Sequence, residues 1–149
     1  MILYLDTSAL VKRYVTEQGS DEVLALIDQA ELVGSSLLTR VEMASVLAKA
    51  SRMGWVGVVD AHKAWEMFLS HWQTVTRFSV TPRLVERAST LAWEHGMRGY
   101  DSIHFASAII WQETLEMPIV LATYDRELWL AARNVGMAAW PDQPAWAVS

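Results

Sequence analysis

The sequence predicts an α/β fold built around a mostly parallel sheet of about five strands. Three observations predict it. Short runs that are apolar at nearly every position alternate with longer segments of helical periodicity. Uninterrupted apolar runs are typical of strands that are covered on both faces. Residues that favour turns and helix ends separate the two kinds of segment. Because strands and helices alternate, we expect parallel pairing, with helices packed on the sheet.

Five short apolar runs are predicted as strands, because each is too short to form a helix and stops at a polar or turn-forming residue. The first run ends directly at Asp6, and the fourth ends just before Asp125. The predicted strands are residues 2–5, 32–36, 77–80, 118–123 and 137–140.

Seven segments are predicted as helices, because their apolar residues recur three or four positions apart. Several carry end signals: Ser20 and Asp21 resemble a cap, Thr81 precedes Pro82 at a helix start, and Gly96 stands at a helix end. The predicted helices are residues 7–15, a segment beginning at 20–21, and residues 39–53, 58–75, 81–95, 99–113 and 125–134.

Composition indicates one compact domain over residues 1–149. Hydrophobic residues make up 52% of the 149 and charged residues 19%, a balance opposite to that of disordered chains. The chain has no cysteine, which excludes disulfides, thiolate metal sites and cysteine nucleophiles. No apolar run reaches the roughly 18 residues of a membrane helix, and the N-terminus lacks a basic leader. We therefore expect a cytoplasmic protein without a membrane partner.

The formal net charge is −5. Proteins that grip duplex nucleic acid by its phosphates are usually basic, so the charge argues against a general DNA-binding protein. It leaves room for an enzyme that contacts RNA briefly and uses metal ions to offset its own carboxylates.

Four acids occupy positions where parallel α/β folds place their ligands. Asp6 and Asp125 follow predicted strands, and Glu42 and Asp101 fall in the first turns of predicted helices. The carboxyl ends of parallel strands share one edge of the sheet, and ligands bind there. Clustered carboxylates suit Mg²⁺ or Mn²⁺. Such ions activate water and offset the charge of a phosphodiester, so the pattern favours metal-assisted phosphoryl chemistry.

Each acid also has a simpler interpretation as a helix cap. Asp is a favoured N-cap, and carboxylates are stabilised near helix N-termini. Thr39 and Glu42 have the spacing of a capping box, in which Glu42 would bond back to the Thr39 amide. Taken singly, the acids are more readily explained as caps. Taken together they would repel one another unless a cation lay among them.

Four segments resemble the motifs of PIN-domain nucleases in order and spacing: residues 5–12, 39–45, 99–108 and 121–128. The resemblance implies a PIN-like three-layer α/β/α sandwich that binds Mg²⁺ or Mn²⁺ and hydrolyses RNA phosphodiester bonds. It also implies that Asp6, Glu42 and Asp101 form the main metal shell and that Asp125 completes the shell or holds a second ion. The resemblance further implies that Ser8 and Thr123 occupy positions that often support the acids by hydrogen bonding.

The compact length is similar to that of VapC toxins from type II toxin–antitoxin modules. This similarity implies an endoribonuclease toxin, a homodimer, and a small VapB-like antitoxin that blocks the site. Three alternatives remain open: a stand-alone PIN nuclease in RNA processing, a receiver-like signalling domain, and a non-catalytic module whose acids are all caps.

Other residues carry weaker signals. His104 lies three positions after Asp101, on nearly the same helix face, and we expect it to be buried or to support a ligand rather than to bind metal. The eight tryptophans are expected mainly in the core. Lys12, Arg98 and Arg126 lie near the acids in sequence, where they would contact RNA phosphates, balance the carboxylates, or face solvent.

Overall fold

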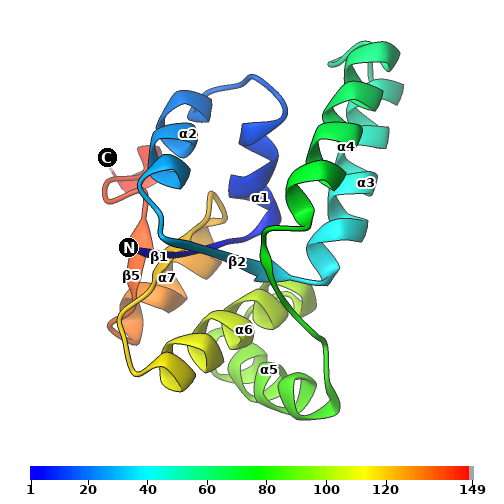
Figure 1. The fold of residues 1–149 in the computed structure, drawn as a ribbon. Helices are drawn as coiled ribbons and strands as arrows, with labels where there is room; N and C mark the ends of the chain where they lie inside the picture. The colour runs from blue at the N-terminus through cyan, green and yellow to red at the C-terminus, as the bar shows by residue number, and fades with distance from the viewer. Residues whose placement is uncertain (148–149) are drawn as a thin grey trace.

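The computed structural model describes residues 1–147, and these contain one five-stranded sheet of order β3-β2-β1-β4-β5 (Figure 1). All four strand pairings are parallel, so the sheet is fully rather than mostly parallel. Each predicted strand is present: the first two have the predicted bounds, the third begins one residue earlier and ends two earlier, and the last two are shorter than predicted. The strands are β1 (Ile2–Leu5), β2 (Leu32–Ser36), β3 (Thr76–Phe78), β4 (Val120–Ala122) and β5 (Ala138–Trp140).

Each predicted helix is also present. The first ends earlier than predicted: α1 stops after one turn and continues as the 3₁₀ turn η1 (Val11–Arg13). A second 3₁₀ turn, η2 (Ala145–Ala147), follows β5. The helices are α1 (Thr7–Leu10), α2 (Ser20–Asp28), α3 (Leu38–Arg52), α4 (Val58–Trp72), α5 (Pro82–His95), α6 (Gly99–Leu115) and α7 (Arg126–Asn134).

Two hydrophobic clusters lie on opposite faces of the sheet and make it the middle of three layers. Successive side chains of a strand point to opposite faces. Accordingly, Tyr4 of β1 packs in a cluster with residues of α5, α6 and α7, whereas Leu3 and Leu5 pack with α1, α3 and α4. Figure 1 shows α5 and α6 below the sheet and α1 above it. This is the predicted α/β/α sandwich.

The tryptophans divide between core and surface. Trp72, Trp111 and Trp129 are buried, as expected, but Trp55 and Trp93 are among the exposed large hydrophobic residues. Burial was therefore the wrong expectation for those two. Among residues 1–147, no helix has both the length and the apolar character needed to cross a membrane.

Two of the predicted helix caps do not form. The residue before α2 is Gly19, with a left-handed φ of 90° and no side-chain cap, so Ser20 and Asp21 do not cap this helix. The helix α3 begins at Leu38 without a side-chain cap. The Thr39 hydroxyl instead lies 2.7 Å from that of Ser35, so the predicted capping box does not form.

Candidate active site

The four acids come from four different elements that meet near one edge of the sheet. Asp6 directly follows β1, and its amide donates to the Ala122 carbonyl of β4 at 3.2 Å. Asp125 follows β4 and is the N-cap of α7. Asp101 lies in the first turn of α6. Glu42 lies near the start of α3, which follows β2. Parallel pairing of β2, β1 and β4 directs these segments to the carboxyl edge.

Asp6 is buried, with 3% of its surface exposed, and its carboxylate is fixed by a set of donors. Its Oδ1 accepts from the Ala9 amide at 3.0 Å and from the Ser8 hydroxyl at 2.7 Å. Its Oδ2 accepts from the Thr123 hydroxyl at 2.6 Å. Burial raises the pKa of Asp6, and the charge of His104 and these hydrogen bonds offset only part of the rise. Asp6 therefore caps α1, and burial makes its ionised form unfavourable in the absence of a cation.

Ser8 and Thr123 also join the two strand ends to each other. The Ser8 hydroxyl accepts from the Tyr124 amide at 2.8 Å, and the Thr123 hydroxyl accepts from the Asp125 amide at 3.0 Å. The segment after β4 is thereby held beside Asp6. Ser8 and Thr123 thus both hydrogen-bond Asp6, and their support of a catalytic acid stays a prediction.

Asp101 and Asp125 share one arginine. Nε of Arg98 lies 3.3 Å from Oδ2 of Asp101, and its Nη2 donates to Oδ2 of Asp125 at 3.0 Å. The other oxygen of Asp125 accepts from the Leu128 amide at 2.9 Å and caps α7. Burial and the charge of Asp125 raise the pKa of Asp101 to about 6, although Arg98 opposes the rise. A cation is therefore favoured between these two carboxylates, and Arg98 supplies one.

Glu42 makes no cap. Its Oε1 accepts from the Thr7 hydroxyl at 2.9 Å and lies 2.8 Å from Nε2 of His104. Burial raises the pKa of Glu42, but the bonds to His104 and Thr7 outweigh it, and the pKa falls below its usual range. Glu42 is consequently ionised at neutral pH. His104 supports this acid, as the sequence led us to expect.

The donor chemistry of the four acids fits a hard divalent cation, because all their ligand atoms are carboxylate oxygens. As the side chains stand, however, no three acids or histidines among residues 1–147 are gathered tightly enough to enclose an ion. Arg98 pairs with both Asp101 and Asp125, and Nε2 of His104 lies 2.8 Å from one oxygen of Glu42. A cation bound by Asp101 and Asp125 would therefore compete with Arg98.

The charge of Asp101 should make the metal-free protein less stable as the pH rises. Its carboxyl holds a proton more tightly in the folded state than in the unfolded chain. The pKa is raised from the ordinary value of 3.8 to about 6 in the folded protein. Stability from this group is therefore lost as the pH rises through that window. From about pH 4 to about pH 7 in EDTA, the free energy of unfolding should fall relative to that of Asp101→Asn by on the order of 2 kcal/mol, since one pKa unit corresponds to about 1.4 kcal/mol.

Urea denaturation of both proteins across this range measures the difference. Mn²⁺ serves as the control, because a bound cation stabilises the ionised carboxylate and should flatten the fall. Parallel pH profiles for wild type and Asp101→Asn in EDTA would contradict the assignment.

Three participants were not assigned from the sequence. Thr7 and Tyr4 contact the Glu42–His104 pair, and Arg98 was only one of three candidate cations. Tyr4 lies on β1 two positions before Asp6, which directly follows that strand, and this nearness in sequence was the available signal. Lys12 is paired with Glu17 at 3.0 Å and lies over the Tyr124 ring.

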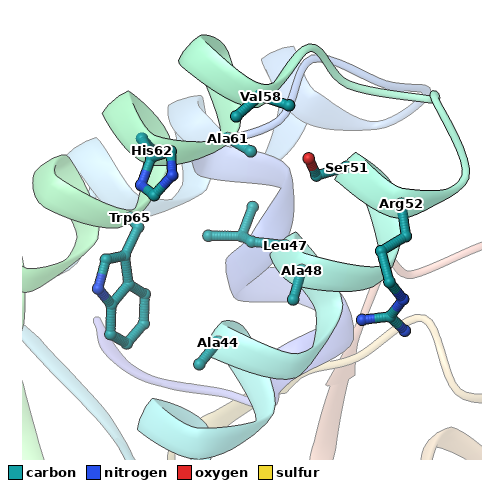
Figure 2. A pocket seen from close by; sticks show the side chains of 9 residues that line it. All are labelled: Ala44, Leu47, Ala48, Ser51, Arg52, Val58, Ala61, His62 and Trp65. Atoms are coloured by element: carbon teal, nitrogen blue, oxygen red, sulfur yellow. The ribbon is translucent and has the colours of Figure 1, made fainter.

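A separate cavity of about 360 Å³ lies between α3 and α4 (Figure 2). Its nine lining residues include none of the four acids. Its wall is mainly apolar, with Leu47 and Trp65 on opposite helices and Arg52 and His62 among the polar lining groups. This cavity is thus separate from the four acids.

Comparison with known proteins identifies the family. A family model described as PIN domain matches residues 3–134. Ribonuclease VapC45 of Mycobacterium tuberculosis (strain CDC 1551 / Oshkosh) is 33% identical over 145 residues, covering 95% of this chain and 96% of the relative.

Two solved structures share the fold. PAE2754 from Pyrobaculum aerophilum has a TM-score of 0.64 at 24% identity, covering 93% of this chain and 83% of that one. A toxin–antitoxin complex from Klebsiella pneumoniae has a TM-score of 0.54 at 17% identity, covering 80% of this chain and 84% of that one. The family match excludes the receiver-like alternative. The chain belongs to the PIN domain family.

Proposed function

We propose that this chain is a Mg²⁺- or Mn²⁺-dependent endoribonuclease that acts as the toxin of a type II toxin–antitoxin module. The observation that carries the proposal is a connected set of acids from three separate elements: Thr123 links Asp6 to the Asp125 amide, and Arg98 pairs with both Asp125 and Asp101. The pKa of Asp101 is raised by burial and by the charges of both other acids, which a divalent cation would relieve. The relative VapC45 is named a ribonuclease.

In this proposal Asp6, Asp101 and Glu42 hold the ion, and Asp125 completes the shell or holds a second ion. A bound divalent cation lowers the pKa of a coordinated water and offsets charge on the phosphodiester. The chain's own residues orient the ligands: Ser8 and Thr123 fix Asp6, and Thr7 and His104 fix Glu42. The carboxylates alone would repel the phosphate of RNA, and the ion offsets this repulsion.

The toxin role, a small VapB-like antitoxin, a homodimer and a cytoplasmic location are parts of the same proposal, as is a single PIN domain over residues 1–149. The Klebsiella pneumoniae toxin–antitoxin complex that shares this fold supports the antitoxin. Growth arrest on expression, relieved by the product of a small neighbouring gene, is expected for a toxin. Cleavage of RNA without growth arrest would indicate a stand-alone nuclease of RNA processing.

The direct test incubates the purified chain with total RNA in Mn²⁺, in Mg²⁺ and in excess EDTA, and maps the new RNA ends by sequencing. We expect cleavage at defined positions with either ion and none in EDTA. Undiminished cleavage in EDTA would rule out the metal site. Failure to cleave RNA, together with no binding of Mn²⁺ by calorimetry, would favour the non-catalytic module instead.

Replacing Arg98 should strengthen metal binding. The Arg98 side chain is 75% exposed and pairs with both Asp101 and Asp125, so it competes with an incoming cation. Exposed ion pairs are weak, and we expect Arg98→Ala to bind Mn²⁺ roughly two- to fivefold more tightly. Isothermal calorimetry measures the change. Arg87→Ala is the matched control, because Arg87 pairs with Glu113 elsewhere on the surface at 2.8 Å. Equal or weaker affinity for Arg98→Ala would refute the competition.

A further inference from the structure

A chain of three side chains runs from the middle of the sheet to the acid cluster. The Tyr4 hydroxyl of β1 lies 3.0 Å from Nδ1 of His104 in α6, and Nε2 of His104 lies 2.8 Å from Oε1 of Glu42 in α3. Tyr4 is fully buried and His104 is 2% exposed. One hundred residues separate Tyr4 from His104, and 62 separate His104 from Glu42.

We propose that Tyr4 and His104 are positioning residues that hold Oε1 of Glu42 and thereby present its other oxygen, Oε2, to the metal. The inference rests on the proposed metal-dependent function. It goes beyond that function by assigning a task to two buried residues and by choosing between the two oxygens of one ligand.

The contact with Glu42 places a proton on Nε2 of His104. An ionised carboxylate only accepts hydrogen bonds, so Nε2 must donate to Glu42. The Tyr4 hydroxyl can donate to Nδ1 or accept from it, and in either case the 3.0 Å contact fixes the other side of the ring. Tyr4 acts on Glu42 by keeping the His104 ring in this orientation.

The same contacts leave the two oxygens of Glu42 unequal. Oε1 accepts from His104 and from Thr7, which accounts for two hydrogen bonds to a single oxygen. Among residues 1–147, no side-chain hydrogen bond to Oε2 is formed. Glu42 is only partly buried, with 25% of its side chain exposed, so Oε2 is accessible to a cation.

Direct metal binding by His104 is disfavoured by the same geometry. Both ring nitrogens already have partners, and the ring lies in the interior between Tyr4 and Glu42. A hard divalent ion also prefers the oxygen ligands nearby. Partners that orient metal ligands typically change metal affinity 10- to 100-fold when removed. A merely structural histidine would change stability without that loss.

The chain offers a matched control in a second Tyr–His pair. The Tyr14 hydroxyl lies 3.2 Å from Nδ1 of His71, and no salt bridge joins His71 to an acid within residues 1–147. Tyr4→Phe and Tyr14→Phe each remove one hydroxyl from a ring that contacts a histidine. Only Tyr4→Phe should alter metal binding.

The experiment measures Mn²⁺ binding by calorimetry for wild type, Tyr4→Phe, Tyr14→Phe, His104→Leu and His104→Gln, with unfolding in EDTA measured in parallel. We expect His104→Leu and Tyr4→Phe to weaken Mn²⁺ binding by about 10- to 100-fold. His104→Gln should recover part of the affinity, because its amide N–H can again donate to Oε1. Tyr14→Phe should bind as wild type does.

Nitrogen-15 spectra of the imidazole rings provide a readout that does not depend on metal. The chain has four histidines, and the signal missing from His104→Gln assigns His104. We expect a ring protonated on Nε2 in wild type and a changed Nδ1 signal in Tyr4→Phe. Where Tyr4→Phe fails to fold, His104→Leu and His104→Gln carry the comparison.

The outcomes separate this proposal from the proposed function. Wild-type Mn²⁺ affinity in folded Tyr4→Phe and His104→Leu overturns the positioning role and leaves the metal site standing. Equal losses in His104→Gln and His104→Leu overturn the donor role of Nε2. Absence of Mn²⁺ binding by wild type removes the metal site, and the positioning role with it.

Discussion

Asp6→Asn should lower metal-dependent RNA cleavage by at least about 100-fold, a loss typical of removing a group that stabilises developing charge, while the protein stays folded. Asparagine keeps an oxygen for the Ala9 amide and the Ser8 hydroxyl, and its amide nitrogen can donate to Thr123. Burial raises the pKa of Asp6, so removing its charge costs the metal-free protein little. The free energy of unfolding should change by less than about 1 kcal/mol.

Cleavage rates on one RNA, with urea unfolding of the same preparations, test this expectation. Asp60→Asn is the control, since Asp60 is exposed in the first turn of α4, away from the other acids, and should behave as wild type. Retained activity in Asp6→Asn would show that the acid is only a cap. Lost activity with a lost fold would show that its role is structural.

Trp72→Ala should destabilise the protein by about 3–5 kcal/mol, the cost of deleting a large buried aromatic side chain. Trp72 ends α4 with 1% of its surface exposed, and its ring lies 5.2 Å from that of Phe68. Both belong to the cluster that packs α4 against β1 and α3. The cavity left by the indole would remove contacts that no neighbouring side chain can replace.

Urea denaturation measures this loss too. Trp93→Ala is the matched control because Trp93 is 91% exposed, and its removal should change stability by no more than about 0.5 kcal/mol. Similar effects for the two substitutions would contradict the core assignment. The expected contrast between the two substitutions cannot be read from composition, which treats all eight tryptophans alike.

For two of the four acids, a helix-capping role is compatible with the proposed role in metal binding. Asp6 and Asp125 each accept from a backbone amide at a helix start, as cap preferences predict. The same carboxylates also lie at the edge where the proposed ion would bind. For Glu42 the cap interpretation was wrong, because its carboxylate turns away from the α3 amides toward Thr7 and His104.

The sequence by itself determined the order of strands and helices, the parallel sheet and the placement of Asp6 and Asp125 at strand ends. These follow from short-range periodicity, which reports which faces of each element are buried. Helix ends were less well predicted where backbone geometry replaced a side-chain cap, as at Gly19.

Only the tertiary structure decided which side chains meet around the acids. Arg98 reaches Asp125 across 27 residues, His104 reaches Glu42 across 62, and Tyr4 reaches His104 across 100. Such hydrogen bonds depend on how the helical layers pack on the sheet. Local sequence patterns do not encode which residues far apart in the sequence this packing brings together. The acids could therefore be named from the sequence, whereas the contacts that orient and neutralise them required the fold.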